Sequence, residues 1–268
     1  MSAEARAPAE RSQTAWFCAG NADDRLTTLA LESLLTELAS HGASPLAVYS
    51  HTAPFSTAPL RLDGRDRLAR SFEHYTRLRI PAIRLEELCR LLANPRRRAA
   101  FAEDGARYSP ILVSGPAVPE EGLPSVADAV VLLAAKGTST ASWVYQAARN
   151  LAAKSADLPV SIVVMNAAHL EEAAVFYQDV REEVVSLLGR ELSIGFAGFL
   201  RFEPDYADLA VKNGVSLVEG FPSSPIHGQI KYVLKALTAA VAAKRPAQPY
   251  FDRMAALISG AEWRPVVR

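Results

Sequence analysis

The spacing of apolar residues predicts strands and helices that alternate along most of the chain. Continuous apolar runs, typical of strands buried on both faces of a parallel sheet, occur at residues 14–18, 45–49, 111–113, 129–134, 161–165, 195–200 and 216–218. Apolar residues three and four positions apart predict helices at residues 25–40, 141–154, 170–188, 206–212 and 226–244. This order predicts an α/β three-layer sandwich, with helices on both faces of a mostly parallel sheet.

The two ends of the chain differ from this pattern. Residues 1–13 have no apolar periodicity, and we expect a disordered tail there, before one domain at residues 14–243. Residues 244–268 form a C-terminal extension with a short amphipathic helix. That helix fits a membrane, a partner protein or the chain's own domain. Its apolar face consists of Tyr250, Phe251, Met254, Leu257 and Ile258.

Residues 60–107 carry an excess of positive charge. The segment contains twelve arginines and seven acidic residues, and its pattern predicts mainly helix. Such a segment is typical of a solvated helical face. It also fits a docking surface for an acidic partner, a lipid or a nucleic acid, and the sequence leaves these alternatives open.

The composition excludes several classes of protein. The 268 residues include 29 basic and 29 acidic ones, so the formal charge is zero, and half of the residues are hydrophobic. A strongly basic nucleic-acid-binding protein and an acidic disordered protein are therefore excluded. Cys18, Cys89 and five widely spaced histidines predict neither a disulfide framework nor a metal site. The N-terminal segment has acidic residues and no apolar stretch, so we expect a cytoplasmic protein.

Four passages carry a resemblance to a known family. They are YSPILVSGPAV at 108–118, VADAVVLLAAKGTSTASWVYQAARNL at 126–151, SIVVMN at 161–166 and LVEGFPSSPIHGQI at 217–230. Together with the first strand, glycine and helix, they resemble the MinD/ParA family of P-loop ATPases, especially its FlhG-like branch. The resemblance implies a P-loop NTPase-like fold that binds ATP with Mg²⁺ at the first strand and acts with protein partners.

The phosphate-binding loop departs from that family. The chain reads GNADDRLTT at 20–28 where the family has Gly-Lys-Gly-Gly-Val-Gly-Lys-Thr-Thr. Asn21 and Leu26 replace the two lysines, which would neutralise phosphate charge. Asp23 and Asp24 would bring negative charge to the place of the triphosphate, and both also suit simple helix capping.

The carboxylates that the family uses for Mg²⁺ and water are replaced as well. Ser50 and His51 follow the second strand, and Ser114 stands where the metal-associated aspartate is found. The resemblance therefore implies no catalytic and no metal-binding residue, and only a vestigial nucleotide site in which Asn166 would contact adenine. Its expected members are Gly20, Arg25, Thr27, Thr28, Asn166, Pro222 and Ser223.

These observations predict a non-catalytic, pseudo-ATPase regulator of the placement or number of a cell-envelope machine, such as a flagellum. It would act on a protein partner, either a second copy or an active paralogue, with peripheral contact at the inner membrane face left open. One alternative is an active ATPase that binds ATP or ADP with Mg²⁺ through an atypical loop. A ParA-like DNA partition protein is the other, although the neutral charge does not favour nucleic acid.

Overall fold

The computed structural model describes residues 13–21, 24–50, 57–62, 68–70, 80–115, 123–137, 139–152, 158–188, 193–242 and 248–260. Its strands are β1 (Ala15–Gly20), β2 (Leu46–Tyr49), β3 (Thr57–Leu62), β4 (Leu68–Arg70), β5 (Ile80–Arg84), β6 (Ile111–Ser114), β7 (Ala129–Ala135), β8 (Val160–Met165) and β9 (Ile194–Leu200). They form one nine-stranded sheet in the order β4-β3-β5-β2-β6-β1-β7-β8-β9. Neighbouring strands are parallel except for β3 and β4, so the mostly parallel sheet is confirmed.

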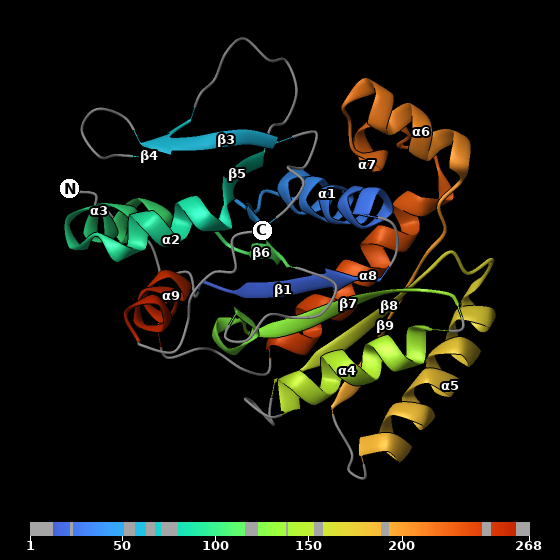
Figure 1. The fold of residues 1–268 in the computed structure, drawn as a ribbon. Coiled ribbons are helices and arrows are strands. Elements are labelled where there is room, and N and C mark those ends of the chain that lie inside the picture. Colours follow the sequence, from blue (N-terminus) through green and yellow to red (C-terminus); the bar gives the residue numbers. More distant parts are fainter. Residues whose placement is uncertain are drawn as a thin grey trace, which may run out of the picture.

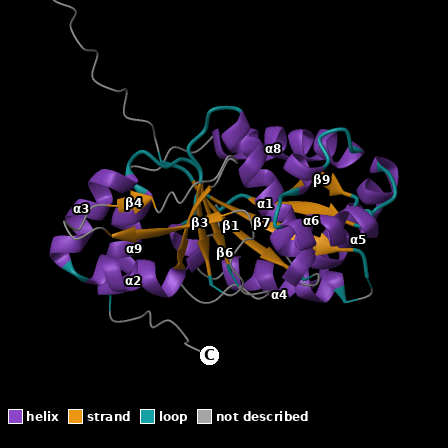
Figure 2. Cartoon of the chain, turned by 90° about the horizontal axis from the view of Figure 1, so that it is seen from above, coloured by secondary structure: helices purple, strands orange, loops and turns teal. Residues whose placement is uncertain are grey.

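Helices cover both faces of this sheet (Figure 1 and Figure 2). On one face lie α2 (Leu85–Ala93), α3 (Pro95–Gly105), α4 (Thr140–Ala152), α5 (Leu170–Leu188) and α9 (Tyr250–Ser259). On the other face lie α1 (Asp24–Ser40), α6 (Pro204–Asn213), α7 (Leu217–Gly220) and α8 (Pro225–Ala242). A 3₁₀ turn, η1 (Leu123–Val126), precedes β7. The predicted three-layer α/β sandwich is therefore the observed architecture.

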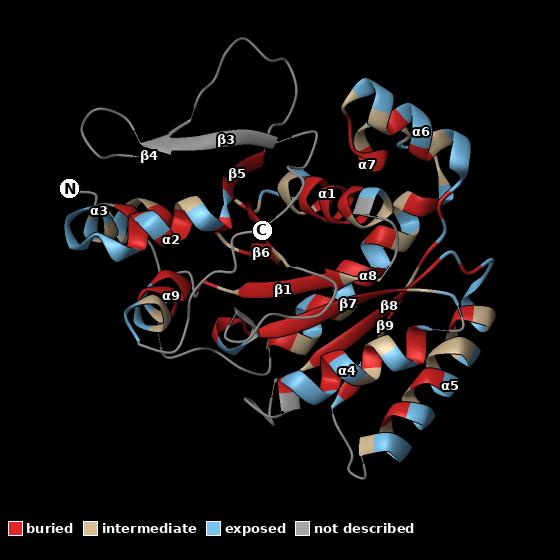
Figure 3. Cartoon of the chain, in the orientation of Figure 1, coloured by how far each residue is buried: buried red, intermediate tan, exposed pale blue. Residues whose placement is uncertain are grey.

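The central strands are buried on both faces (Figure 3). Successive side chains of a strand point to opposite faces, and β1 shows this clearly. Ala15 and Phe17 belong to the core beneath α2, α4 and α9, while Trp16 and Cys18 belong to the core beneath α1 and α8. Continuous apolar runs are the sequence signature of such two-sided burial.

The arginine-rich segment contains strands that its sequence pattern does not predict. β3, β4 and β5 come first, and the first helix among the described residues of this segment begins at Leu85. The expectation of a mainly helical segment over 60–107 is thus wrong in its first half. Ile80 and Ile83 are buried and extend the parallel sheet next to β2, so tertiary packing outweighs the weak local pattern.

Residues 216–218 were also expected to form a strand and do not. They lie at the start of the short helix α7, because Ser216 caps it: its hydroxyl accepts a hydrogen bond from the backbone N–H of Glu219 at 3.2 Å. A buried helix turn and a buried strand have the same short apolar pattern. The sheet therefore ends at β9.

The C-terminal helix α9 packs on the chain's own domain. Tyr250, Phe251 and Met254 are at most 1% exposed, and Leu257 and Ile258 pack partly buried against the same core. Of the three surfaces that the sequence left open for this apolar face, the structure shows the chain's own domain, where α2, α3 and η1 cover it. Among the described helices, none has the length and apolar character needed to cross a bilayer.

Polar contacts fix α9 in this position. Arg253 forms an ion pair with Asp128, whose Oδ2 also accepts a hydrogen bond from the backbone N–H of Ala15 at 2.7 Å. Gln13 accepts a hydrogen bond from the N–H of Tyr250 at 3.1 Å and donates one to the carbonyl of Gly105 at 2.7 Å. Residue 13 is therefore part of the folded domain, whereas the rest of the expected tail, residues 1–12, lies outside the described residues.

Candidate functional site

The carboxyl ends of the parallel strands meet at one edge of the sheet, where open α/β sheets bind ligands. β1 ends here at Gly20, and α1 begins four residues later. The two elements approach closely, since a Cβ atom at Gly20 would lie 2.5 Å from Oγ1 of Thr27. That hydroxyl is buried and has no hydrogen-bond partner among the described residues. Gly20 is therefore required by close packing, independently of any phosphate.

The side chain of Asn21 joins two loops at this edge. Its Oδ1 accepts a hydrogen bond from the backbone N–H of Ala135 at 2.6 Å, and its Nδ2 donates one to Oγ1 of Thr140 at 3.1 Å. Its backbone N–H donates to the carbonyl of Leu133 at 3.3 Å and so continues the β1–β7 ladder. Asn21, which the resemblance places at the first family lysine, is thus occupied by bonds within its own chain.

The next described residues, at the start of α1, also make their contacts within the chain. Leu26, which the resemblance places at the second family lysine, is partly buried against the core beneath α1. Arg25 forms an ion pair with Asp208 of α6 at 2.5 Å. Thr28 is buried at 8% exposure. Asp23 and the side chain of Asp24 lie outside the described residues.

Among the described residues, the ends of β6 and β2 carry no carboxylate. Ser114 ends β6, and the following Gly115 is so close to Phe17 that a Cβ atom there would lie 2.2 Å from the ring. Ser50 follows β2 and donates its backbone N–H to the carbonyl of Ser114 at 3.2 Å. Its hydroxyl is buried without a hydrogen-bond partner in the described structure. His51 lies outside the described residues.

A second set of contacts joins the loops after β7 and β8. Glu172 accepts hydrogen bonds from Lys136 and from the backbone N–H of Ala168, the latter at 2.6 Å. The bond from Lys136, and then the one from Ala168, lower the pKa of the Glu172 carboxyl. Asn166 is exposed, has a left-handed backbone with φ of 65°, and donates its backbone N–H to the carbonyl of Leu200 at 2.8 Å.

The structure does not bring all expected site residues together. Gly20, Arg25, Thr27 and Asn166 lie at or beside the carboxyl edge. Pro222 instead accepts a hydrogen bond from His227, whose other ring nitrogen lies 2.8 Å from Glu37. Glu37 is thirteen residues beyond the start of α1, or about 20 Å along the helix axis.

The turn with Pro222 and the exposed Ser223 therefore does not border the same site. The residues that lie at the carboxyl edge after β9 are instead those that begin at Arg201. Its sequence lacks the family-like pattern that drew attention to residues 217–230.

Comparisons with known proteins agree on the architecture. No family model matches the sequence, and no characterised protein shows significant sequence similarity. Solved structures do match: a ParA family ATPase from Chlorobium tepidum has a TM-score of 0.57 and 14% identity over 84% of this chain and 98% of that one. MinD from Aquifex aeolicus, in its complex with MinC, has a TM-score of 0.54 and 16% identity over 84% and 96%. The chain has the MinD/ParA fold.

A third solved structure of this fold contains a bound nucleotide. MinD from Pyrococcus horikoshii, solved with Mg-ADP, has a TM-score of 0.54 and 14% identity over 84% of this chain and 96% of that chain. The residues described here do not fit such a group. Asn21 is bonded internally, Leu26 is apolar, and the described residues contain no cluster of three or more acidic, histidine or cysteine side chains that could hold a metal ion.

Sequence reasoning missed the residues that hold this edge together. The sequence indicates Asn21 only as a position where the resembled family has lysine, and Thr140, Lys136 and Glu172 carry no signal of their own. Their contacts join positions 36 to 119 residues apart in sequence. A polar residue directly after a predicted strand was the one available sign, because such residues meet at the carboxyl edge.

Proposed function

We propose that the protein is a MinD/ParA-like regulator that acts through protein contacts and does not hydrolyse nucleotide. The observation that supports this most is the position of Asn21. A P-loop needs free backbone N–H groups and a lysine aimed at phosphate. Here the backbone N–H of Asn21 donates to β7, its side-chain oxygen accepts from Ala135, and its side-chain nitrogen donates to Thr140 at the start of α4.

The missing charges support the same conclusion. Phosphoryl transfer depends on cations that neutralise the developing charge, and on carboxylates that hold Mg²⁺. In this chain Leu26 and Ser114 occupy two of those positions, and Arg25 is paired with Asp208. We therefore assign Gly20, Thr27 and Asn166 to the architecture of the edge, and assign no catalytic residue.

Placement of a cellular machine is the biological role that we propose. MinD of Pyrococcus horikoshii is a septum site-determining protein, and Aquifex MinD is solved in complex with MinC. By analogy with those proteins, this chain would act in the cytoplasm on a protein partner and regulate the position or number of a cell-envelope assembly, for which a flagellum is our first choice.

Phosphate release from ATP tests the absence of hydrolysis. The purified full chain would be assayed with ATP and Mg²⁺ beside the Chlorobium ParA family ATPase as an active control. We expect release no faster than from a variant in which Thr27 is replaced by valine, since no residue assigned here activates water. Turnover above that variant, abolished by Thr27→Val, would contradict the proposal.

A further inference from the structure

The strand β9, at one end of the sheet, has neither a charge nor a proline to prevent pairing with another strand. No described strand pairs with its outer side (Figure 1). Its seven residues read IGFAGFL. At the opposite end of the sheet, β4 is only three residues long and ends in Arg70. Short length and charge are common protections of an edge strand, whereas a long, uncharged, apolar edge is a template for another strand.

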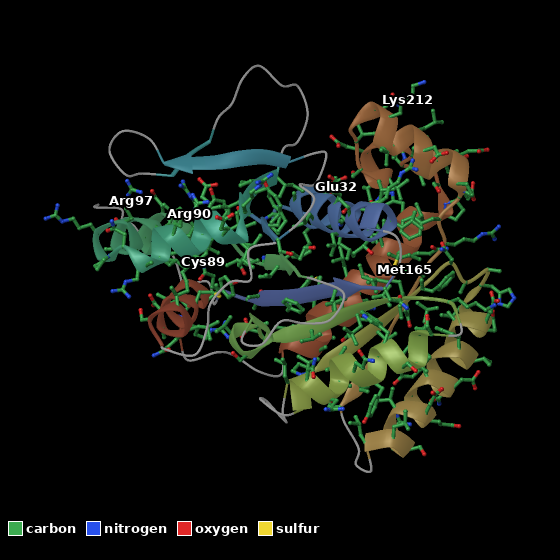
Figure 4. The ribbon with its side chains drawn as sticks, in the orientation of Figure 1. Glu32, Cys89, Arg90, Arg97, Met165 and Lys212 are labelled. Carbon is green, nitrogen blue, oxygen red and sulfur yellow. The ribbon has the colours of Figure 1, made fainter. Side chains whose placement is uncertain are left out.

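Hydrogen bonds to β8 determine which residues of β9 point outward. The carbonyl of Ser193 accepts the N–H of Val160 at 3.1 Å, and the carbonyl of Leu200 accepts the N–H of Asn166 at 2.8 Å. Met165, labelled in Figure 4, precedes that asparagine and pairs with Leu200. Ser193 and Leu200 therefore point toward β8. In a parallel pair, the backbone groups of the residue next to each of them point away from β8.

The outward residues are therefore Ile194 and Phe199, although five positions separate them. Residues an odd number apart normally point in opposite directions along a strand. Here the register shifts between Ile162 and Val163 of β8, so Ala197 is an extra residue and brings both to the same side. The side chains of Ile194 and Phe199 also pack in the same core, on the α5 side of the sheet.

Aromatic side chains border this edge on both faces. On the α5 side, the hydroxyl of Tyr177 donates to the carbonyl of Ile194 at 2.7 Å, and its ring lies 5.2 Å from that of Phe196. A carbonyl oxygen has a second lone pair, so it can still accept a bond from another strand. On the other side, Tyr232 of α8 is 55% exposed and lies beside Gly198. Exposed aromatic rings are typical of protein interfaces.

We propose that β9 pairs antiparallel with β9 of a second copy, about a two-fold axis perpendicular to the sheet. Antiparallel strands join through pairs of residues whose N–H and C=O groups face each other. Ile194 then faces Phe199 of the second copy, and Phe199 faces Ile194. The same register sets Gly195 opposite Gly198 of the second copy on the α8 side, so no side chains collide there. The two sheets become one, and the contact closes as a dimer.

The sequence of β9 favours a second copy as its partner. One register satisfies both the backbone directions and the faces of the side chains. Residues 193–200 carry no charge, so two identical strands meet without repulsion. Pairing of β9 with β4 of another copy is less suited, because β4 offers three residues and a charge. The contact is separate from the carboxyl edge and goes beyond the proposed function, since it holds whether or not nucleotide binds.

Sedimentation velocity of the full chain tests this dimer. The interface is small, so we expect the sedimentation coefficient to rise from that of a monomer to that of a dimer between about 1 and 200 μM. The rise should persist in about 500 mM NaCl, because no charged group takes part. A chain that stays monomeric at about 200 μM overturns the proposal. Association that is lost in high salt, or that continues beyond the dimer, also overturns it.

A lysine on the edge should prevent the pairing. Gly195 is exposed, and a Cβ atom there would lie 3.9 Å from its nearest neighbour, so Gly195→Lys fits the monomer. The matched control is Gly137→Lys, at an exposed glycine after β7 with similar space. We expect G195K to stay monomeric and G137K to associate like the wild type, with circular dichroism showing that both are folded. Wild-type association of folded G195K, or equal loss in G137K, overturns the proposal.

A spin label on Ser193→Cys tests the register. Ser193 is exposed, and both native cysteines are buried, so the label enters at this position alone. Residue 193 lies opposite Leu200 of the second copy, so the two labelled backbones are about 20 Å apart, or six regular strand steps. Pulsed electron paramagnetic resonance at about 200 μM measures this distance. A distance above about 40 Å in the dimer overturns the proposal.

Discussion

Replacement of Arg253 by methionine is expected to destabilise the protein strongly, because it leaves a buried carboxylate without its cation. The two Nη atoms of Arg253 lie 2.8 and 3.0 Å from the carboxylate of Asp128, and the two side chains are only 17% and 5% exposed. Removal of one partner from a buried ion pair costs about 3–5 kcal/mol. At about 2–4 °C per kcal/mol, this corresponds to a fall in melting temperature of roughly 6–20 °C.

Urea unfolding followed by circular dichroism measures the free energy of unfolding that R253M loses. Two further variants test whether the loss comes from the unpaired carboxylate. Arg149 is exposed on α4, so Arg149→Met should change the free energy of unfolding by less than about 0.5 kcal/mol. The double variant D128N/R253M removes both charges but keeps an acceptor for the N–H of Ala15. It should therefore be more stable than R253M alone.

The reasoning would be refuted if R253M unfolded within about 1 kcal/mol of the wild type. Such a result would mean that α9 is held by Tyr250, Phe251 and Met254 alone, and that Asp128 is easily rehydrated. A double variant as unstable as R253M would also contradict it, since the penalty would then come from lost packing of the arginine stem.

Two further predictions concern the carboxyl edge and the core. Asn21→Ala removes the hydrogen bonds to Ala135 and Thr140, at about 0.5–1.5 kcal/mol each, so urea unfolding should show a loss of about 1–3 kcal/mol. An unchanged midpoint would show that Asn21 does not join the two loops. Burial raises the pKa of Cys18 and of Cys89 to about 12, so both stay protonated near pH 8. Ellman's reagent should label them only as the protein unfolds, and rapid labelling of the native chain would contradict their burial.

The sequence predicted the fold well wherever two-sided burial leaves a continuous apolar run. β1, β7 and β8 are such strands, and each lies within one or two residues of its expected bounds. The sequence pattern does not predict β5, because its short run contains Pro81 and ends in Arg84; pairing with β2 and β3 makes it a strand. Packing decided that element, and packing is not visible in local spacing.

For the candidate site, the sequence indicates which family residues are missing, but not which contacts the residues in their place make. The resemblance to the MinD/ParA family already places Asn21 and Leu26 where that family has lysines. The partners of Asn21 are not predictable in this way, because Ala135 and Thr140 lie 114 and 119 residues away along the chain. Pro222 was assigned by resemblance to a pocket, whereas its bond to His227 places it far along α1.

Equilibrium dialysis of the full chain against labelled ATP with Mg²⁺ tests the central claim most directly. The account predicts no saturable binding up to about 1 mM ATP, which corresponds to less than about 4 kcal/mol of binding free energy. ADP with Mg²⁺ should behave in the same way. Saturable binding at micromolar ATP that is lost in the variants Thr27→Val and Asn166→Ala would show that this edge still holds nucleotide, and would contradict the account.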